Sequence, residues 1–121
     1  MSTKFVRNGD TITYTNSTGS AISSGDVVVT GNLIGIAITD IAIGESGELA
    51  TSGVHEVPKV SAAVFAQGEK LIYDVSAGEF DDSSATPATG DVTGAAVAWV
   101  AGSNGETTAQ VLLTPGNSDV A

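Results

Sequence analysis

The chain has 121 residues, a net charge of -10 at pH 7 and only four lysines and arginines, so its electric field repels nucleic-acid backbones and anionic membranes. This length corresponds to one domain with a modest core, which oligomerisation would help to stabilise. The absence of cysteine excludes disulfides and thiolate metal sites. We therefore expect neither a nucleic-acid partner nor a membrane partner.

Glycine–acid pairs punctuate the whole sequence. Eight of the fourteen acidic residues directly follow a glycine. Glycine adopts the positive φ that tight turns require, and a following carboxylate stays solvated, so each pair predicts a surface turn. The pairs are Gly9-Asp10, Gly25-Asp26, Gly44-Glu45, Gly47-Glu48, Gly68-Glu69, Gly78-Glu79, Gly90-Asp91 and Gly105-Glu106. Most acids are thus assigned to turns, which leaves few for acid–base chemistry.

The first third of the chain predicts three strands. Residues 11–15 alternate threonine with apolar residues, as a half-buried strand does. Residues 26–30 form a valine-rich strand. Residues 33–39 are apolar on both faces, which makes this segment the best core candidate.

The middle of the chain predicts three further strands and one helical turn. Residues 48–52 and 54–57 are short extended segments that we expect at sheet edges. Residues 60–67 are the only helical candidate, because alanines favour helix and Gly68 would end it. Residues 70–74 alternate again and predict a strand.

The last third predicts a loop and two closing strands. Residues 81–89 are rich in serine, alanine, threonine and proline, as a mobile loop is. Residues 93–101 and 107–114 predict the strands. The whole pattern indicates an all-β fold, a small single-domain antiparallel barrel or sandwich with at most one short helix.

The domain organisation is simple. We expect an extended N-terminal arm at residues 1–10, a β domain at 11–115 and a short C-terminal tail at 116–121. The sequence lacks the apolar stretch of a signal peptide or a bilayer span, so we expect synthesis in the cytoplasm. Without a secretion signal, the glycosylation sequon Asn16-Ser17-Thr18 is interpreted as an accidental match.

Candidate catalytic and metal-binding residues are few. The single histidine, His55, has no second histidine or cysteine to accompany it, and a general base needs a positioned partner. Four acids, Asp74, Glu79, Asp81 and Asp82, would suit calcium through their oxygen atoms, but their spacing does not fit a calcium loop. A solvated hairpin tip is the favoured interpretation, and we predict no metal and no cofactor.

Residues 102–107 have a superficial likeness to a phosphate-binding loop. That motif would need glycine in place of Val100 and lysine in place of Glu106, and a carboxylate at the second position would repel phosphate. A turn between two strands explains the segment better. We therefore expect a protein without enzymatic activity.

Two features suit contacts with partners. Trp99 is the only tryptophan and lies among small apolar residues, which predicts a core or subunit-interface anchor more than a ligand platform.

Half of the cations lie in the first seven residues, within the segment Lys4, Phe5, Val6 and Arg7. Its strand-like alternation would let it add to a sheet edge on a partner, whereas the alternative is a frayed terminus.

The order of these segments resembles the tailed-phage capsid cement, or head decoration, proteins. The likeness runs through residues 8–14, 24–28, 35–59, 66–74 and 94–98, and is densest in the third of these. Members of this family often carry the label of a predicted RecA/RadA-type phage recombinase. The missing phosphate loop argues against that activity here.

The resemblance implies a small β protein that coats the outside of an icosahedral head, as trimers or alternatively as dimers. Its partner would be the phage major capsid protein, whose neighbouring subunits it would clamp together. In such proteins the N-terminal segment orders against the shell, which makes Lys4, Phe5, Val6 and Arg7 the candidate capsid contacts. The expected location is the surface of the virion capsid.

Two alternatives belong to other functional classes. An enzyme of phage DNA metabolism would need a phosphate site or a basic surface. A glycan- or receptor-binding β module would use a loop such as 81–90 with aromatic stacking, and Phe80 is the only aromatic residue beside that loop.

Overall fold

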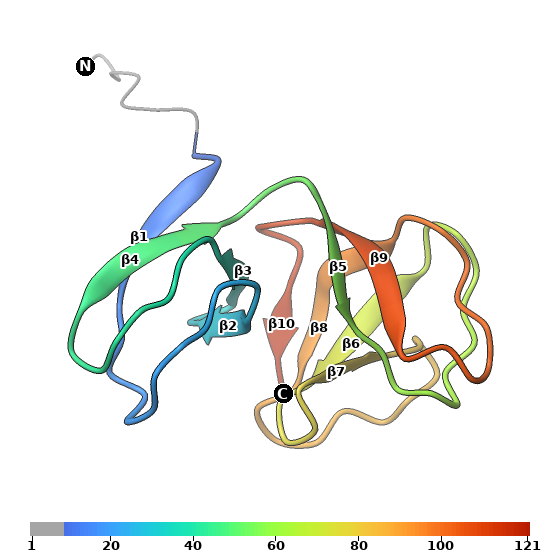
Figure 1. Ribbon diagram of the computed structural model, residues 1–121. Helices are drawn as coiled ribbons and strands as arrows, with labels where there is room; N and C mark the ends of the chain where they lie inside the picture. The colour runs from blue at the N-terminus through green and yellow to red at the C-terminus, as the bar shows by residue number, and fades with distance from the viewer. Residues whose placement is uncertain (1–8) are drawn as a thin grey trace, which may run out of the picture.

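The computed structural model describes residues 9–121, which form ten β-strands and no helix (Figure 1). The all-β prediction is confirmed for this part of the chain, and most of the expected arm lies outside it. The strands are β1 Thr11–Thr15, β2 Val27–Thr30, β3 Leu33–Ala37, β4 Ser46–Ala50, β5 Val54–Pro58, β6 Lys70–Asp74, β7 Glu79–Asp81, β8 Val92–Ala98, β9 Thr108–Leu113 and β10 Asp119–Val120.

The strands form two antiparallel sheets that lie side by side (Figure 1). The first has the order β1-β4-β3-β2, and the second has the order β5-β9-β8-β6-β7, with β10 paired to β8. The second sheet curls toward a barrel, because Lys59, directly after β5, pairs in parallel with Phe80 of β7. The chain crosses from one sheet to the other once, between β4 and β5.

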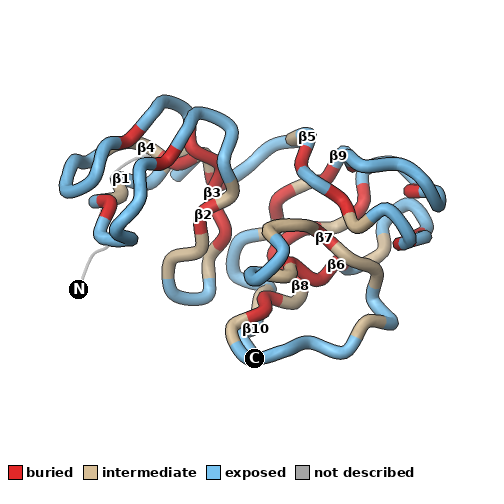
Figure 2. The backbone as a smooth tube through the Cα atoms, turned by 60° about the horizontal axis from the view of Figure 1, so that its bottom comes forward, coloured by how far each residue is buried: buried red, intermediate tan, exposed pale blue. Residues whose placement is uncertain are grey.

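Two hydrophobic clusters stabilise this arrangement. The larger joins the sheets, since Ile34 and Ile36 of β3 belong to the same cluster as the interior of the second sheet. The smaller covers the opposite face of the first sheet and includes Leu49. Figure 2 shows the buried stretches on the strands and the exposed ones on the loops around them. The core position predicted for residues 33–39 is therefore confirmed for β3, whereas Ile38, which follows the strand, is 48% exposed.

The glycine–acid pairs form turns at seven of the eight positions, where the glycine has positive φ. In four of these turns the carboxylate also stabilises the turn. It accepts a hydrogen bond from the backbone N–H of the residue three positions earlier. These bonds join Asp26 to Ser23 at 2.9 Å, Glu69 to Ala66 at 3.1 Å, Asp91 to Ala88 at 2.9 Å and Glu106 to Ser103 at 2.5 Å. These acids therefore also close their own turns. The expectation of a solvated carboxylate is wrong only for Asp91, which is 5% exposed.

The pair Gly47-Glu48 is the exception and lies inside β4. A Cβ at Gly47 would lie 2.6 Å from Cγ1 of Ile41, so only glycine fits beside this core residue. The expected edge position of this strand is also wrong, since β4 lies between β1 and β3. The edge position of β5 is confirmed.

The helix expected at residues 60–67 does not form. Phe65 instead pairs with Gly102, and the two residues exchange N–H···O bonds of 3.1 and 2.9 Å. Ala63 and Phe65 are both buried, which is the alternation of extended chain and not of helix. Tertiary pairing overrides the local helical propensity of the alanines.

The C-terminal part departs from expectation at three places. The strand expected at residues 93–101 ends at Ala98. Asp81 belongs to β7, so the loop between β7 and β8 begins one residue later than expected. The segment 116–121, expected as a tail, contains β10. Its last residue, Ala121, donates to the carbonyl of Asp91 at 2.9 Å and accepts the N–H of Gly90 at 2.8 Å.

Candidate functional site

The four candidate contact residues of the arm, Lys4, Phe5, Val6 and Arg7, lie outside the described residues. The structure does fix where the chain enters the fold. Thr51, in the crossing between the sheets, donates through Oγ1 to the carbonyl of Gly9 at 2.5 Å and through its N–H to the carbonyl of Asp10 at 2.9 Å. Residue 9 is therefore held at the junction of the two sheets.

Trp99 lies directly after β8 and belongs to neither core cluster, because 48% of its surface is exposed. Its backbone is nonetheless fixed. The N–H donates to the carbonyl of Gln110 at 2.9 Å, and its carbonyl accepts from Nε2 of Gln67 at 3.1 Å. Val100, next in the chain, is 44% exposed. The position suits an intermolecular contact and not a core anchor.

The candidates His55 and Asp74, and the turn acid Glu69, are engaged in local structure. His55 Nε2 lies 2.9 Å from the carbonyl of Ser52. Asp74 accepts the N–H and hydroxyl of Ser76, and these bonds hold the pKa of its carboxyl below the usual value. Glu69 accepts hydrogen bonds from the N–H and the hydroxyl of Ser83, at the start of the loop between β7 and β8. These bonds lower the pKa of the Glu69 carboxyl.

These contacts do not assemble a metal centre. Within residues 9–121, no three histidine or acidic side chains gather closely enough to hold a metal ion. The same range contains no helix long and apolar enough to cross a bilayer.

The segment 102–107 is a turn anchored by a buried lysine. Lys59 is only 1% exposed, and its Nζ donates to the carbonyls of Val60 at 2.9 Å and Ser103 at 3.0 Å. It also reaches the carbonyls of Ser61 at 3.4 Å and Glu106 at 3.3 Å. The ammonium group lies 5.8 Å from the centre of the Phe65 ring. This cation therefore joins the chain after β5 to the turn before β9 and is not available to a phosphate.

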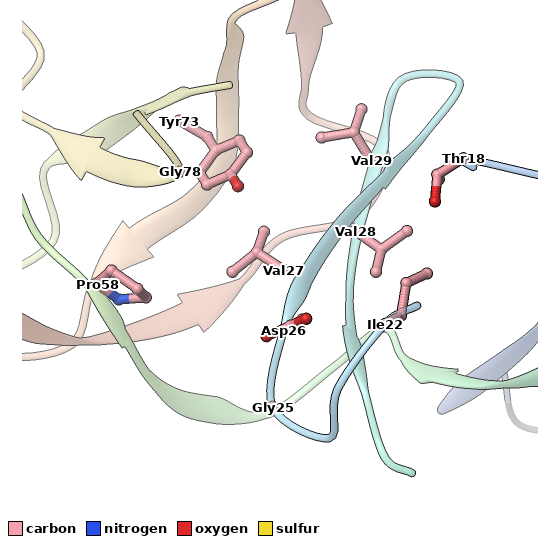
Figure 3. Close-up of a pocket in the computed structure, with 10 residues that line it drawn as sticks. All are labelled: Thr18, Ile22, Gly25, Asp26, Val27, Val28, Val29, Pro58, Tyr73 and Gly78. Atoms are coloured by element: carbon pink, nitrogen blue, oxygen red, sulfur yellow. The ribbon is translucent and has the colours of Figure 1, made fainter. Parts of the chain in front are cut away.

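A cavity of about 350 Å³ lies between the two sheets, along β2 (Figure 3). Val27 and Val29 point toward Tyr73 and Pro58 of the second sheet, whereas Val28 points the other way (Figure 3). The Tyr73 ring packs against Phe80 with centroids 5.0 Å apart. Burial, and then the charges of Asp26 and Asp74, raise the pKa of the Tyr73 phenol, so it remains a neutral hydrogen-bond donor.

This cavity was not anticipated from the sequence. Its walls come from β2, from Pro58 at the end of β5 and from Tyr73 of β6, which the fold brings together from distant parts of the chain. The valine-rich pattern predicted the strand but carried no signal for its position at the end of a sheet.

Three features stand out in this small all-β protein: residue 9 held beside Thr51, a half-exposed tryptophan and an open cavity at a sheet edge. A family model of phage cement proteins matches residues 6–113. The chain belongs to the phage cement protein family, which confirms the resemblance seen in the sequence. No curated protein matches this sequence.

Membership of this family gives the chain a structural role associated with the phage capsid and a location in the virion. The family is structural and not enzymatic. Its expected association is with phage capsid proteins.

Proposed function

We propose that this chain decorates the outside of the assembled icosahedral capsid and stabilises it by clamping neighbouring major capsid subunits. The observation that carries the proposal is the match to phage cement proteins, which spans residues 6–113 and so includes β1 to β9. A protein that binds only the assembled shell stabilises that state by mass action. Each clamp touches several subunits, so modest contacts act at high effective concentration.

The decorating unit is a homotrimer, with a dimer as the alternative. The half-exposed indole of Trp99 supports a subunit interface at this end of β8, because a large aromatic residue in contact with water is stabilised when a neighbour covers it. Catalysis has no part in this function. The acidic turns keep the coat soluble.

The segment containing Lys4, Phe5, Val6 and Arg7 contacts the shell. We expect deletion of residues 2–7 to leave far-ultraviolet circular dichroism and oligomer mass unchanged, because β1 begins only at Thr11 and Thr51 holds residues 9 and 10. Binding to capsids that lack this protein should weaken about tenfold, since two cations and two apolar side chains are lost. Sedimentation of the capsids with bound protein measures the change.

A matched variant carries glycine and serine at positions 2–7, so that length is kept and side chains are removed. This variant should bind as weakly as the deletion. Full binding by both would show that the segment makes no contact with the shell.

A further inference from the structure

The cavity between the sheets follows the free edge of β2. Among the described residues, β2 pairs with β3 alone and ends the first sheet. Residues from both faces of the strand line the cavity, since Val27 and Val29 pack toward the larger core cluster and Val28 belongs to the smaller. A space that touches both faces of one strand lies along the edge of that strand. We call this space the β2 groove.

The backbone of β2 offers hydrogen bonds to the groove. The carbonyl of Asp26 accepts the N–H of Ala37 at 2.9 Å, and Val28 lies opposite Gly35. Because bonded pairs alternate in an antiparallel ladder, the N–H and C=O groups of Val27 and Val29 face away from β3. An extended segment placed in the groove would therefore continue the sheet through these groups.

The side chains of the groove are apolar along its length and acidic at one end. Val27, Pro58 and Tyr73 supply apolar surface, and Asp26 supplies a carboxylate that accepts the N–H of Ser23 at 2.9 Å. No lysine or arginine of the described part of the chain lines the groove. This end of the groove is therefore negatively charged, which favours an occupant with a lysine or arginine there.

We propose that the β2 groove binds an extended segment of the capsid protein, which adds as a strand to β2 and places a lysine or arginine side chain beside Asp26. This inference rests on the proposed function and names the surface and the chemistry of that contact. The free strand edge gives affinity through backbone bonds, the valines accept alternate apolar side chains, and the carboxylate fixes the register.

The test uses the full chain and capsids that lack it, purified from the phage after deletion of the gene for this chain. Binding is measured as copies per capsid against free protein concentration. Asp26→Asn keeps an oxygen for the Ser23 N–H and removes only the charge, so the turn is preserved. We expect affinity to fall about tenfold at low salt, and the difference from wild type to shrink at high salt, where exposed charges are screened.

Asp40→Asn is the matched control. Its carboxylate also accepts a serine N–H from the same loop, that of Ser24 at 2.8 Å, but it does not line the groove. This variant should bind as wild type. Val29→Pro removes a backbone N–H that faces the groove and leaves the hydrogen bonds between β2 and β3 intact. We expect this variant to bind at least tenfold more weakly, with a circular dichroism spectrum that shows a folded chain.

Two outcomes would overturn the inference itself, and a third would reject the proposed function on which it rests. Wild-type binding by both Asp26→Asn and Val29→Pro, on capsids that the wild-type chain coats, would reject the groove and leave the proposed function standing. A change in oligomer mass in both variants would show that a second copy of the chain occupies the groove. Failure of the wild-type chain itself to bind capsids would instead reject the proposed function.

Discussion

Replacing Lys59 with methionine is expected to lower the free energy of unfolding by about 3 kcal/mol and the melting temperature by about 10 °C. The Lys59 side chain is 1% exposed and donates to carbonyls on both sides of a contact between the chain after β5 and the turn before β9. Methionine has a similar shape and fills the space, but it supplies no donor. The decrease in the free energy of unfolding therefore measures the contribution of the hydrogen bonds and not that of the packing.

Lys70→Met is the matched control. Lys70 is exposed at the start of β6, so the same chemical change at this position removes one charge from solvent. Surface substitutions of this kind change stability by less than about 0.5 kcal/mol. Thermal unfolding followed by circular dichroism compares the two variants. Equal melting temperatures would contradict the role assigned to Lys59.

The second large effect is expected for Asn16→Asp, which changes one atom of a fully buried side chain. Asn16 is 0% exposed, and its Nδ2 donates to the carbonyls of Ser20 at 2.8 Å and Ile41 at 3.0 Å. The aspartate would lose both donors and place a carboxylate among carbonyl oxygens. We expect a loss of about 3 kcal/mol at neutral pH.

The pH dependence of this loss identifies its cause. A carboxyl buried at position 16 has a raised pKa in the folded state, so the destabilisation due to its charge appears only as pH rises above its unfolded pKa. The difference from wild type should therefore shrink as pH falls toward 4. Asn104→Asp, at an exposed position, is the control. A loss that stayed constant with pH would point to a changed loop and not to a buried charge.

Local sequence patterns predicted much of the fold because they depend on near neighbours. The alternation in β1 and β6 and the two apolar faces of β3 identify these strands directly, and positive-φ glycines mark seven of the expected turns. The helix expected at residues 60–67 failed because Phe65 pairs with Gly102, and that contact is invisible to local propensity.

The candidate site was harder to predict for the same physical reason. A lysine after a strand is normally solvated, so nothing in the sequence indicates that Lys59 is buried under carbonyls from a distant turn. The sequence marks Asn16 only as part of a sequon, whereas its buried side chain joins two loops through hydrogen bonds to the carbonyls of Ser20 and Ile41. The β2 groove depends on sheet order, which places Val27 near Tyr73 across the two sheets.

The most direct test of the central claim is quantitative mass spectrometry of intact particles from the phage that encodes this chain. Copies of the chain are measured relative to the major capsid protein. A capsid-decorating protein should be present in hundreds of copies at a fixed ratio, because the proposed clamp would occupy every symmetry-related junction of the shell. Absence from intact, DNA-filled particles would contradict the proposal that this protein clamps the assembled capsid.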